Sequence, residues 1–185
     1  AKPILIDVEK NKPLIDVNLV EKNITKKTKA IIPVHLNGRS ANMILLKKIA
    51  KKYNLFIIED CAQALGSKNG NKHLGTQGDI SIFSLSVAKI ISTGQGGFVA
   101  TNSSKLNKKI RLMRTHGVEN ITNPKSWPML GFNFRYTDVL ASIGIEQLNY
   151  IKKRIIFLRK IYTTYKKGLQ NTKFTLIPVD INNGE

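Results

Sequence analysis

Two kinds of segment alternate along the chain. Short apolar runs rich in β-branched residues are followed by stretches in which apolar residues recur every three or four positions. The first pattern is typical of strands buried in a largely parallel sheet, and the second is typical of amphipathic helices. The alternation predicts a three-layer α/β/α fold in which helices cover a mostly parallel sheet. Strands are expected over residues 4–6, 30–34, 55–58, 80–84 and 98–101.

Helical segments lie between and after these strands. Residues 43–53 place apolar side chains on one face and lysines on the opposite face, as in an amphipathic helix packed on a sheet. Asp16 can cap a short helix that runs through Asn23, and Ser103 or Ser104 can cap another. These signals predict three helices before residue 117.

The chain changes character after residue 116. Residues 117–133 contain Pro124, Pro128 and the only tryptophan, and they show no clear period. Such a segment predicts a long loop, and long ordered loops are often functional. From Thr137 to Tyr165 the helical spacing resumes, which predicts one long helix or two in series.

The composition is that of an ordinary globular protein. The 185 residues are 42% hydrophobic and 23% charged, which suits one soluble domain with a real core. No apolar run approaches the ~18–20 residues that are needed to span a bilayer. Because Cys61 is the only cysteine, an internal disulfide is excluded. These features predict a cytoplasmic protein without a membrane partner.

The chain is strongly basic, with a formal net charge of +18 at pH 7. Such a charge can indicate a protein that binds nucleic acid. The lysines, however, are scattered over helix faces and are not gathered in one block. The abundance of Lys, Asn and Ile is also what an AT-rich coding sequence produces. We therefore favour genome bias and expect no nucleic-acid partner, with nucleic-acid binding kept as an alternative.

The ends of the predicted strands are the first place to look for chemistry. In open α/β sheets ligands bind at the carboxyl ends of the strands, which points to His35, Glu59, Asp60 and Ser84. Asp60 follows a run of apolar residues, where a carboxylate is costly unless it meets a partner. It could hold a cationic ring nitrogen of a cofactor, or it could simply cap the next helix.

Lys89 lies between a predicted strand and a glycine-rich turn. An uncharged amine among apolar residues can form a Schiff base, but a loop lysine is as readily a solvated side chain. Residues 94–97 (Gly-Gln-Gly-Gly) fit neither the dinucleotide pattern nor the P-loop pattern. Ser86-x-x-Lys89 matches a motif of penicillin-binding enzymes, but the accessory motifs are missing.

A metal site is not expected. The three histidines are far apart in sequence, and the single cysteine and the lack of paired histidines argue against zinc.

Five segments stand in an order typical of one enzyme family. They are residues 32–38 (Ile-Pro-Val-His-Leu-Asn-Gly), 58–64 (Ile-Glu-Asp-Cys-Ala-Gln-Ala), 78–97 (from Gly-Asp through Lys89 to Gly-Gln-Gly-Gly), 114–117 and 131–138. Together they resemble the DegT/DnrJ family of sugar aminotransferases, which depend on pyridoxal 5′-phosphate (PLP). The resemblance covers nearly the whole chain.

The resemblance implies a role for each residue of a cofactor site. Lys89 would hold PLP as a Schiff base and then act as general acid and base. Asp60 would pair with the pyridinium nitrogen, which keeps the ring an electron sink. Gln63 would hydrogen-bond the phenolic oxygen, Ala62 would lie flat against the ring, and Ser84 would bind the cofactor phosphate.

The resemblance also implies partners and a substrate class. Asn133 would reach the cofactor phosphate of a neighbouring subunit, so a homodimer with a shared active site is expected. His35 and Arg135 are expected to contact a nucleotide-sugar. The favoured reaction transfers an amino group from an amino acid, with glutamate as the expected donor, to a keto-sugar nucleotide. A non-catalytic scaffold and a PLP-dependent sugar dehydratase remain alternatives, although the dehydratase lacks the Schiff-base lysine.

The resemblance further implies a domain division. Residues 1–136 would form the PLP-binding core of the large domain of a type I (aspartate aminotransferase-like) enzyme, without its N-terminal part. Residues 137–185 would form a long helix that leads into a truncated small domain, so the activity of this chain alone stays open. Two residues depart from the family pattern: Ser86 stands where many members have His or another residue, and Gln95 replaces the usual Glu.

Overall fold

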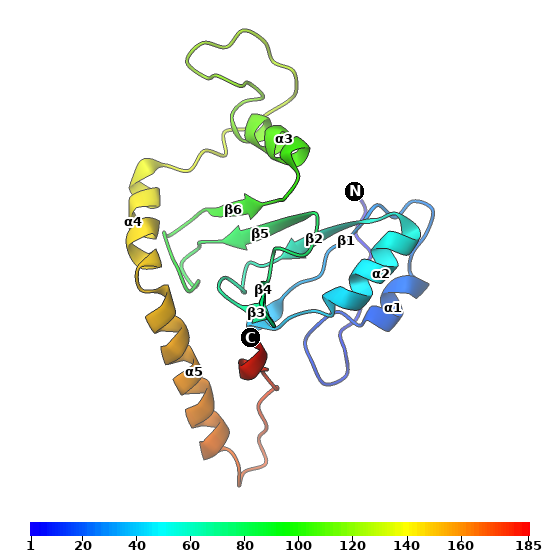
Figure 1. Cartoon of the computed structure of the whole chain (residues 1–185), viewed down its shortest axis with the longest axis vertical. Coiled ribbons are helices and arrows are strands. Elements are labelled where there is room, and N and C mark those ends of the chain that lie inside the picture. Colours follow the sequence, from blue (N-terminus) through cyan, green and yellow to red (C-terminus); the bar gives the residue numbers. More distant parts are fainter.

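A four-stranded sheet lies at the centre of the computed structural model, which describes residues 1–185 (Figure 1). In spatial order its strands are β1 (Ala30–Ile31), β2 (Phe56–Asp60), β5 (Ile80–Ser84) and β6 (Gly97–Ala100). The pairs β1–β2 and β2–β5 are parallel, and β5–β6 is antiparallel. The prediction of an α/β fold with a mostly parallel sheet is therefore confirmed, with an antiparallel strand at one edge.

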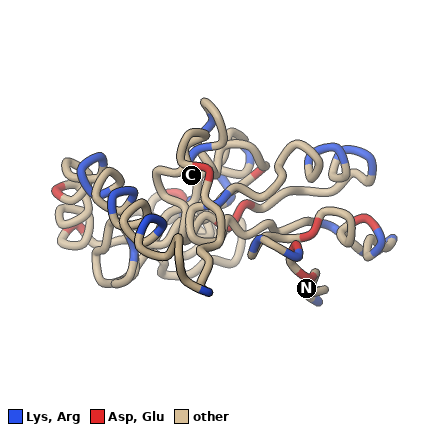
Figure 2. The backbone as a smooth tube through the Cα atoms, turned by 90° about the horizontal axis from the view of Figure 1, so that it is seen from below, with Lys and Arg blue, Asp and Glu red and all other residues tan.

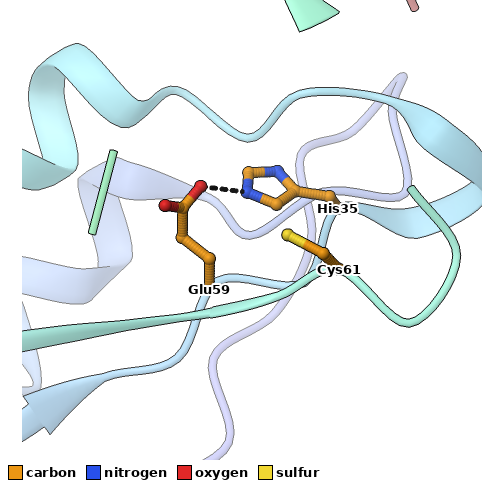
Figure 3. A group of neighbouring side chains, drawn as sticks. All are labelled: His35, Glu59 and Cys61. Atoms are coloured by element: carbon orange, nitrogen blue, oxygen red, sulfur yellow. Dashed lines mark hydrogen bonds and ion pairs between the residues drawn. The ribbon is translucent and has the colours of Figure 1, made fainter. Parts of the chain in front are cut away.

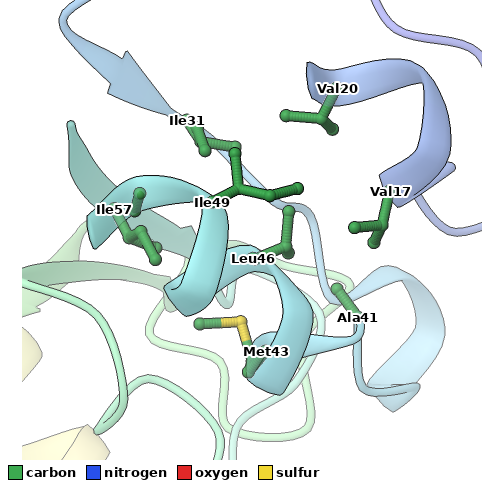
Figure 4. Packing of buried hydrophobic residues seen from close by; sticks show 9 residues of the cluster. Val17, Val20, Ile31, Ala41, Met43, Leu46, Ile49 and Ile57 are labelled. Carbon is green, nitrogen blue, oxygen red and sulfur yellow. The ribbon is translucent and has the colours of Figure 1, made fainter. Parts of the chain in front are cut away.

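One face of the sheet is covered by α1 (Val17–Lys22) and α2 (Met43–Tyr53). The apolar face of α2 packs against the strands β1 and β2, and Met43 and Leu46 are fully buried (Figure 4). The predicted cap Asp16 accepts a hydrogen bond from the first turn of α1. Asn42, a residue type that is common at helix starts, does the same for α2. The core cluster consists of Val17, Val20, Ile31, Ala41, Met43, Leu46, Ile49, Ala50 and Ile57.

The opposite face of the sheet carries exposed apolar side chains. Phe56 is 60% exposed, Ile82 is 39% exposed and Val99 is 44% exposed. Ile82 lies directly opposite Asp60 on the neighbouring strand, and Val99 lies directly opposite Ile82. Since successive side chains of a strand alternate between faces, these residues share one face with Asp60. The helices α1 and α2 thus bury one side of β2 and leave the Asp60 side open.

Two predicted strands differ from the structure. Residues 4–6 form no strand, and Leu5 is 92% exposed; the pairing found nearby is an isolated bridge between Val8 and Ile15. β1 ends at Ile31 because Pro33 has no N–H to donate to a ladder. Pairing resumes only as a bridge between Val34 and Asp60.

Two helices follow one another near the end of the chain, which settles the alternative left open by the sequence. They are α4 (Asp138–Leu148), capped by Thr137, and α5 (Ile151–Gly168). The helix α3 (Ser104–Arg114) is capped by Ser103. Residues 117–133 contain no helix or strand, so the predicted long loop is confirmed. No helix of the chain combines the length and the apolar character that a bilayer crossing requires.

The last residues return from α5 to the strand side of the molecule (Figure 1). The hairpin of β3 (Lys68–Asn69) and β4 (Lys72–His73) meets the turn η2 (Ile181–Asn183), and the Lys68 N–H donates to the Gly184 carbonyl at 2.8 Å. A second turn, η1 (Leu36–Gly38), lies at the end of the chain segment that follows β1.

The basic residues are spread over the molecule. Figure 2 shows Lys and Arg along the helices at both sides, with Asp and Glu scattered among them. The expectation that the lysines do not gather in one block is therefore confirmed.

Candidate functional site

Two polar side chains close neighbouring parallel strands on the open face. Asp60 ends β2 and Ser84 ends β5. Asp60 lies directly opposite Ile82, and Ser84 follows Ile82 by two residues, so Asp60 and Ser84 lie on the same face. Both side chains are half-buried. The structure thus brings together two of the residues that the sequence selected, at the edge where α/β sheets bind ligands.

Asp60 is held in one orientation and keeps an oxygen available. Its Oδ1 accepts a hydrogen bond from the Ala62 N–H at 3.0 Å, an Asx turn that fixes the carboxylate. Its backbone is bonded on both sides to the chain after β1, with the N–H donating to the Pro33 carbonyl and the carbonyl accepting from the His35 N–H, each at 2.9 Å. No group of the chain hydrogen-bonds to Oδ2. A turn and not a helix follows Asp60, so the alternative of a helix cap is wrong.

Gln63 joins the loop after β2 to η1. Its Oε1 accepts a hydrogen bond from the Asn37 N–H at 3.0 Å, and Asn37 adopts a left-handed conformation with φ of 53°. Because the carbonyl oxygen is occupied, the amide nitrogen of Gln63 is the end that stays free to donate. Ala62 lies between Asp60 and Gln63 and is half-buried.

Lys89 lies in the loop that joins β5 to β6. The loop starts at the site, where the Ser86 N–H donates to the Ser84 hydroxyl at 3.3 Å, and the Lys89 N–H donates to the Ser86 carbonyl at 3.0 Å. The Lys89 side chain is half-buried and belongs to none of the ion pairs of the chain. The loop closes through a bond from the Leu85 N–H to the Gly96 carbonyl at 3.0 Å.

A buried network lies on the other face of β2 (Figure 3). Glu59 and His35 are both 0% exposed, and His35 Nε2 lies 2.9 Å from Glu59 Oε2. The Ala41 N–H donates to His35 Nδ1 at 3.1 Å, so Nδ1 is an acceptor and the proton sits on Nε2, which donates to Glu59. Both ring nitrogens are therefore occupied. The expected contact of His35 with a substrate does not fit this geometry, and His35 is a structural residue.

The same network sets the protonation of its acid and its thiol. Burial alone would raise the pKa of Glu59, but the hydrogen bonds from His35 and from the N–H groups of Gly78, Gly75 and Gln77 lower it on balance. Burial, with the negative charges of Glu59 and Asp60, raises the pKa of Cys61 to about 12. Cys61 is thus a neutral thiol and no nucleophile at ordinary pH.

The three side chains of this network also have the residue types of a metal site. Donor atoms of His35, Glu59 and Cys61 all lie within 4.8 Å of one another. The Glu59 oxygens, however, accept four hydrogen bonds, both nitrogens of His35 are used, and the thiol is protonated. The geometry is that of a satisfied hydrogen-bond network.

Asn133 and Arg135 lie apart from these residues. The Arg135 Nε donates to Asn133 Oδ1 at 3.0 Å, and both side chains are exposed. Their segment is bonded to the end of α3, for example from the Phe134 N–H to the Arg114 carbonyl at 3.0 Å. No hydrogen bond joins either residue to Asp60.

Comparison with known proteins decides the family. The sequence profile of the DegT/DnrJ/EryC1/StrS aminotransferase family matches residues 1–184. The chain belongs to this family. GDP-perosamine synthase of Escherichia coli O157:H7 is 40% identical over 172 residues, which cover 92% of this chain and 47% of that protein. The chain spans about half the length of the curated relatives that it matches.

Solved structures of sugar enzymes share the fold. PseC of Helicobacter pylori, an aminotransferase involved in pseudoaminic acid biosynthesis, has a TM-score of 0.88 and 30% identity, over 94% of this chain and 47% of that one. The E. coli GDP-4-keto-6-deoxy-D-mannose-3-dehydratase with bound hydrated PLP has a TM-score of 0.81 and 26% identity, over 91% and 48%. The predicted family and its fold are thereby confirmed.

Proposed function

We propose that this chain is the cofactor-binding part of a PLP-dependent aminotransferase that acts on a keto-sugar nucleotide. The observation that carries the proposal is that Asp60 and Ser84 lie on the same open face of the sheet, with Lys89 in the loop that follows Ser84. The relatives support the substrate class, because GDP-perosamine synthase is named for a nucleotide-sugar product and PseC for a sugar pathway. Glutamate stays the expected amino donor.

The free groups of the site fit the polar groups of PLP. Asp60 Oδ2 is an unpaired anionic acceptor for a protonated ring nitrogen, and the Gln63 amide nitrogen is an unused donor for the phenolic oxygen. The Ser84 hydroxyl, which donates to Ser86 Oγ at 3.1 Å, would turn to donate to the phosphate, and the small Ala62 side chain would leave room for a flat ring. When bound, PLP supplies an electron sink for the negative charge that develops at the amino-acid carbon.

The proposal gives Lys89 two tasks. Its amine would hold the cofactor through the aldehyde carbon, and it would also act as the general acid and base for a 1,3-proton shift. The presence of Lys89 favours amino transfer over dehydration, the reaction of the E. coli relative with bound hydrated PLP.

The remaining assignments are part of the same proposal. Residues 1–136 would form the core of the large domain, and residues 137–185 would lead toward the small domain. Asn133 would complete the phosphate site of a second subunit in a homodimer, which suits its exposed position away from Asp60. Arg135, also exposed, would contact the nucleotide-sugar.

Site-selective trapping of the cofactor tests the proposal. The purified chain is mixed with PLP and reduced with borohydride, and the modified lysines are found by peptide mass spectrometry. We expect the adduct to form preferentially at Lys89, to disappear in Lys89→Ala and to persist in Lys125→Ala, which removes an exposed loop lysine. Equal labelling of Lys89 and of the exposed lysines would refute the cofactor site and favour a non-catalytic scaffold.

A further inference from the structure

The loop that carries Lys89 has a stretch without bonds of its own. Ile90, Ile91 and Ser92 directly follow Lys89, and none of them takes part in a backbone–backbone hydrogen bond. Ile91 is nevertheless only 1% exposed. Backbone groups that are shielded from water need partners, and side chains supply them to the Ile90 carbonyl and to the N–H and carbonyl of Ser92. These side chains come from α4 and α5.

The side-chain amide of Gln147 in α4 forms two hydrogen bonds with the backbone of Ser92. Its Oε1 accepts from the Ser92 N–H at 3.0 Å, and its Nε2 donates to the Ser92 carbonyl. The side chain therefore serves Ser92 as a neighbouring strand would, at a sequence distance of 55 residues. Asn, Glu or Ala at position 147 lacks either the length or one of the two functions.

Arg154 of α5 adds hydrogen bonds to the same loop and to Gln147. Its Nη1 lies 2.6 Å from the Ile90 carbonyl and 2.6 Å from Gln147 Oε1, and it donates toward both. None of the ion pairs of the chain includes Arg154. A half-buried guanidinium is thus directed at two neutral oxygens, and hydrogen bonds from a charged donor are stronger than neutral ones. One of these oxygens belongs to the residue next to Lys89.

The contact between helix and loop continues to the glycine-rich turn. The Tyr136 hydroxyl, just before α4, donates to Thr93 Oγ1. On α4 itself, Gly144 is buried so close to Thr93 that an added Cβ would lie 3.3 Å from the Thr93 methyl group. The whole segment from Ile90 to Thr93 therefore rests on α4 and α5.

We propose that Gln147 and Arg154 are positioning residues that fix the loop segment after Lys89, so that its amine is held at the cofactor. The inference rests on the proposed function of Lys89. A lysine in an unsupported loop would sample many places, whereas a catalytic group must stay within a fraction of an ångström of its target. The two helices, which the family resemblance implies lead toward a second domain, would thus also hold the loop of the cofactor site in place.

The test compares the rate of PLP attachment at Lys89 in matched variants. Gln147→Ala removes the two hydrogen bonds to the Ser92 backbone, and Arg154→Ala removes the charged donor to the Ile90 carbonyl. We expect each change to slow PLP attachment at Lys89 about tenfold. Arg154→Lys keeps the charge and one donor direction and is expected to recover part of the rate. Lys152→Ala, which removes an exposed charge from the same helix, is the control and is expected to match the wild type. Attachment is measured by borohydride quenching and mass spectrometry, and folding by circular dichroism.

Rates equal to the wild type in folded Gln147→Ala and Arg154→Ala would overturn the positioning role and leave the Lys89 site intact. No attachment at Lys89 in the wild type would overturn both proposals. If a variant does not fold, amide hydrogen exchange in the wild-type chain decides. Slow exchange of the Ser92 amide supports its hydrogen bond to Gln147 and hence the positioning role. Exchange as fast as that of the Lys125 amide, which lies in the exposed loop, contradicts it.

Discussion

Replacing Glu59 by Gln tests the buried network most directly. Oε1 accepts from the N–H groups of Gln77 and Gly78, and Oε2 accepts from His35 Nε2 and from the Gly75 N–H. A glutamine has one acceptor oxygen, so its NH₂ must face two donors that lose their partner. Hydrogen bonds to charged groups contribute about 1.5–3 kcal/mol each, which predicts a loss of about 3–5 kcal/mol in the free energy of unfolding after some relaxation.

That loss is a large part of the ~5–15 kcal/mol by which a domain is normally stable. Urea unfolding followed by circular dichroism measures it. The matched control is Asp60→Asn, the same change at the next residue, where a single backbone bond to one carboxylate oxygen is present and the side chain is half-buried. We expect the control to lose about 1 kcal/mol or less. A Glu59→Gln variant with the same free energy of unfolding as Asp60→Asn would refute the claim that the four hydrogen bonds to Glu59 stabilise the fold.

The same carboxylate predicts a dependence on pH. The pKa of Glu59 in the folded chain is lowered from its ordinary value of 4.5. A lowered pKa means that the folded state binds the proton less tightly than the unfolded state, so the stabilisation is present above pH 4.5 and is lost as the pH falls through the folded value. The wild type should therefore lose stability below pH 4.5 more steeply than Glu59→Gln. Parallel curves of unfolding free energy against pH would contradict this assignment.

Further outcomes follow from single contacts. Gly97→Ala should lower the unfolding midpoint strongly, because its Cβ would collide with the Phe83 carbonyl across β5–β6, whereas Gly168→Ala in α5 meets nothing within 4 Å and should raise stability by up to about 1 kcal/mol. Cys61, fully buried and with a pKa of about 12, should react with a thiol reagent at pH 8 only upon unfolding, and rapid reaction of the native chain would disprove its burial. Asn42→Ala removes the side-chain cap of α2 and should cost about 1 kcal/mol in chemical denaturation.

Local signals in the sequence were sufficient where the structure depends on nearby residues. The strand over residues 80–84 is found where the sequence predicts it, and the helix cap is Ser103, one of the two serines that the sequence offers. Residues 4–6 are as apolar as a strand, but a strand also needs a paired neighbour, and pairing is decided by distant parts of the chain. The hydrogen bonds between Gln147 and Ser92 also depend on distant parts of the chain, because no local sequence pattern at either residue indicates a partner 55 positions away.

The candidate site shows a second limit of the sequence. The rule that ligands bind at the carboxyl ends of strands selects an edge of the sheet but not a face. It therefore selected His35 and Asp60 together, although the structure places them on opposite faces. Alternation along the strand contains the missing information: two steps from the buried Ile57 lead to Glu59, and two steps from the buried Pro33 lead to His35.

The alternation along β2 also separates stability from chemistry. Glu59 and Asp60 are adjacent carboxylates, yet one is enclosed by four donors in the core and the other keeps a free oxygen on the open face. Substitution of Glu59 should therefore act first on folding, and it should affect the cofactor only through the loss of structure. Substitution of Asp60 should act on the cofactor in a chain that still folds. If Asp60→Asn left PLP attachment at Lys89 unchanged while Glu59→Gln abolished it in a folded chain, the two faces of β2 would have been assigned the wrong way round.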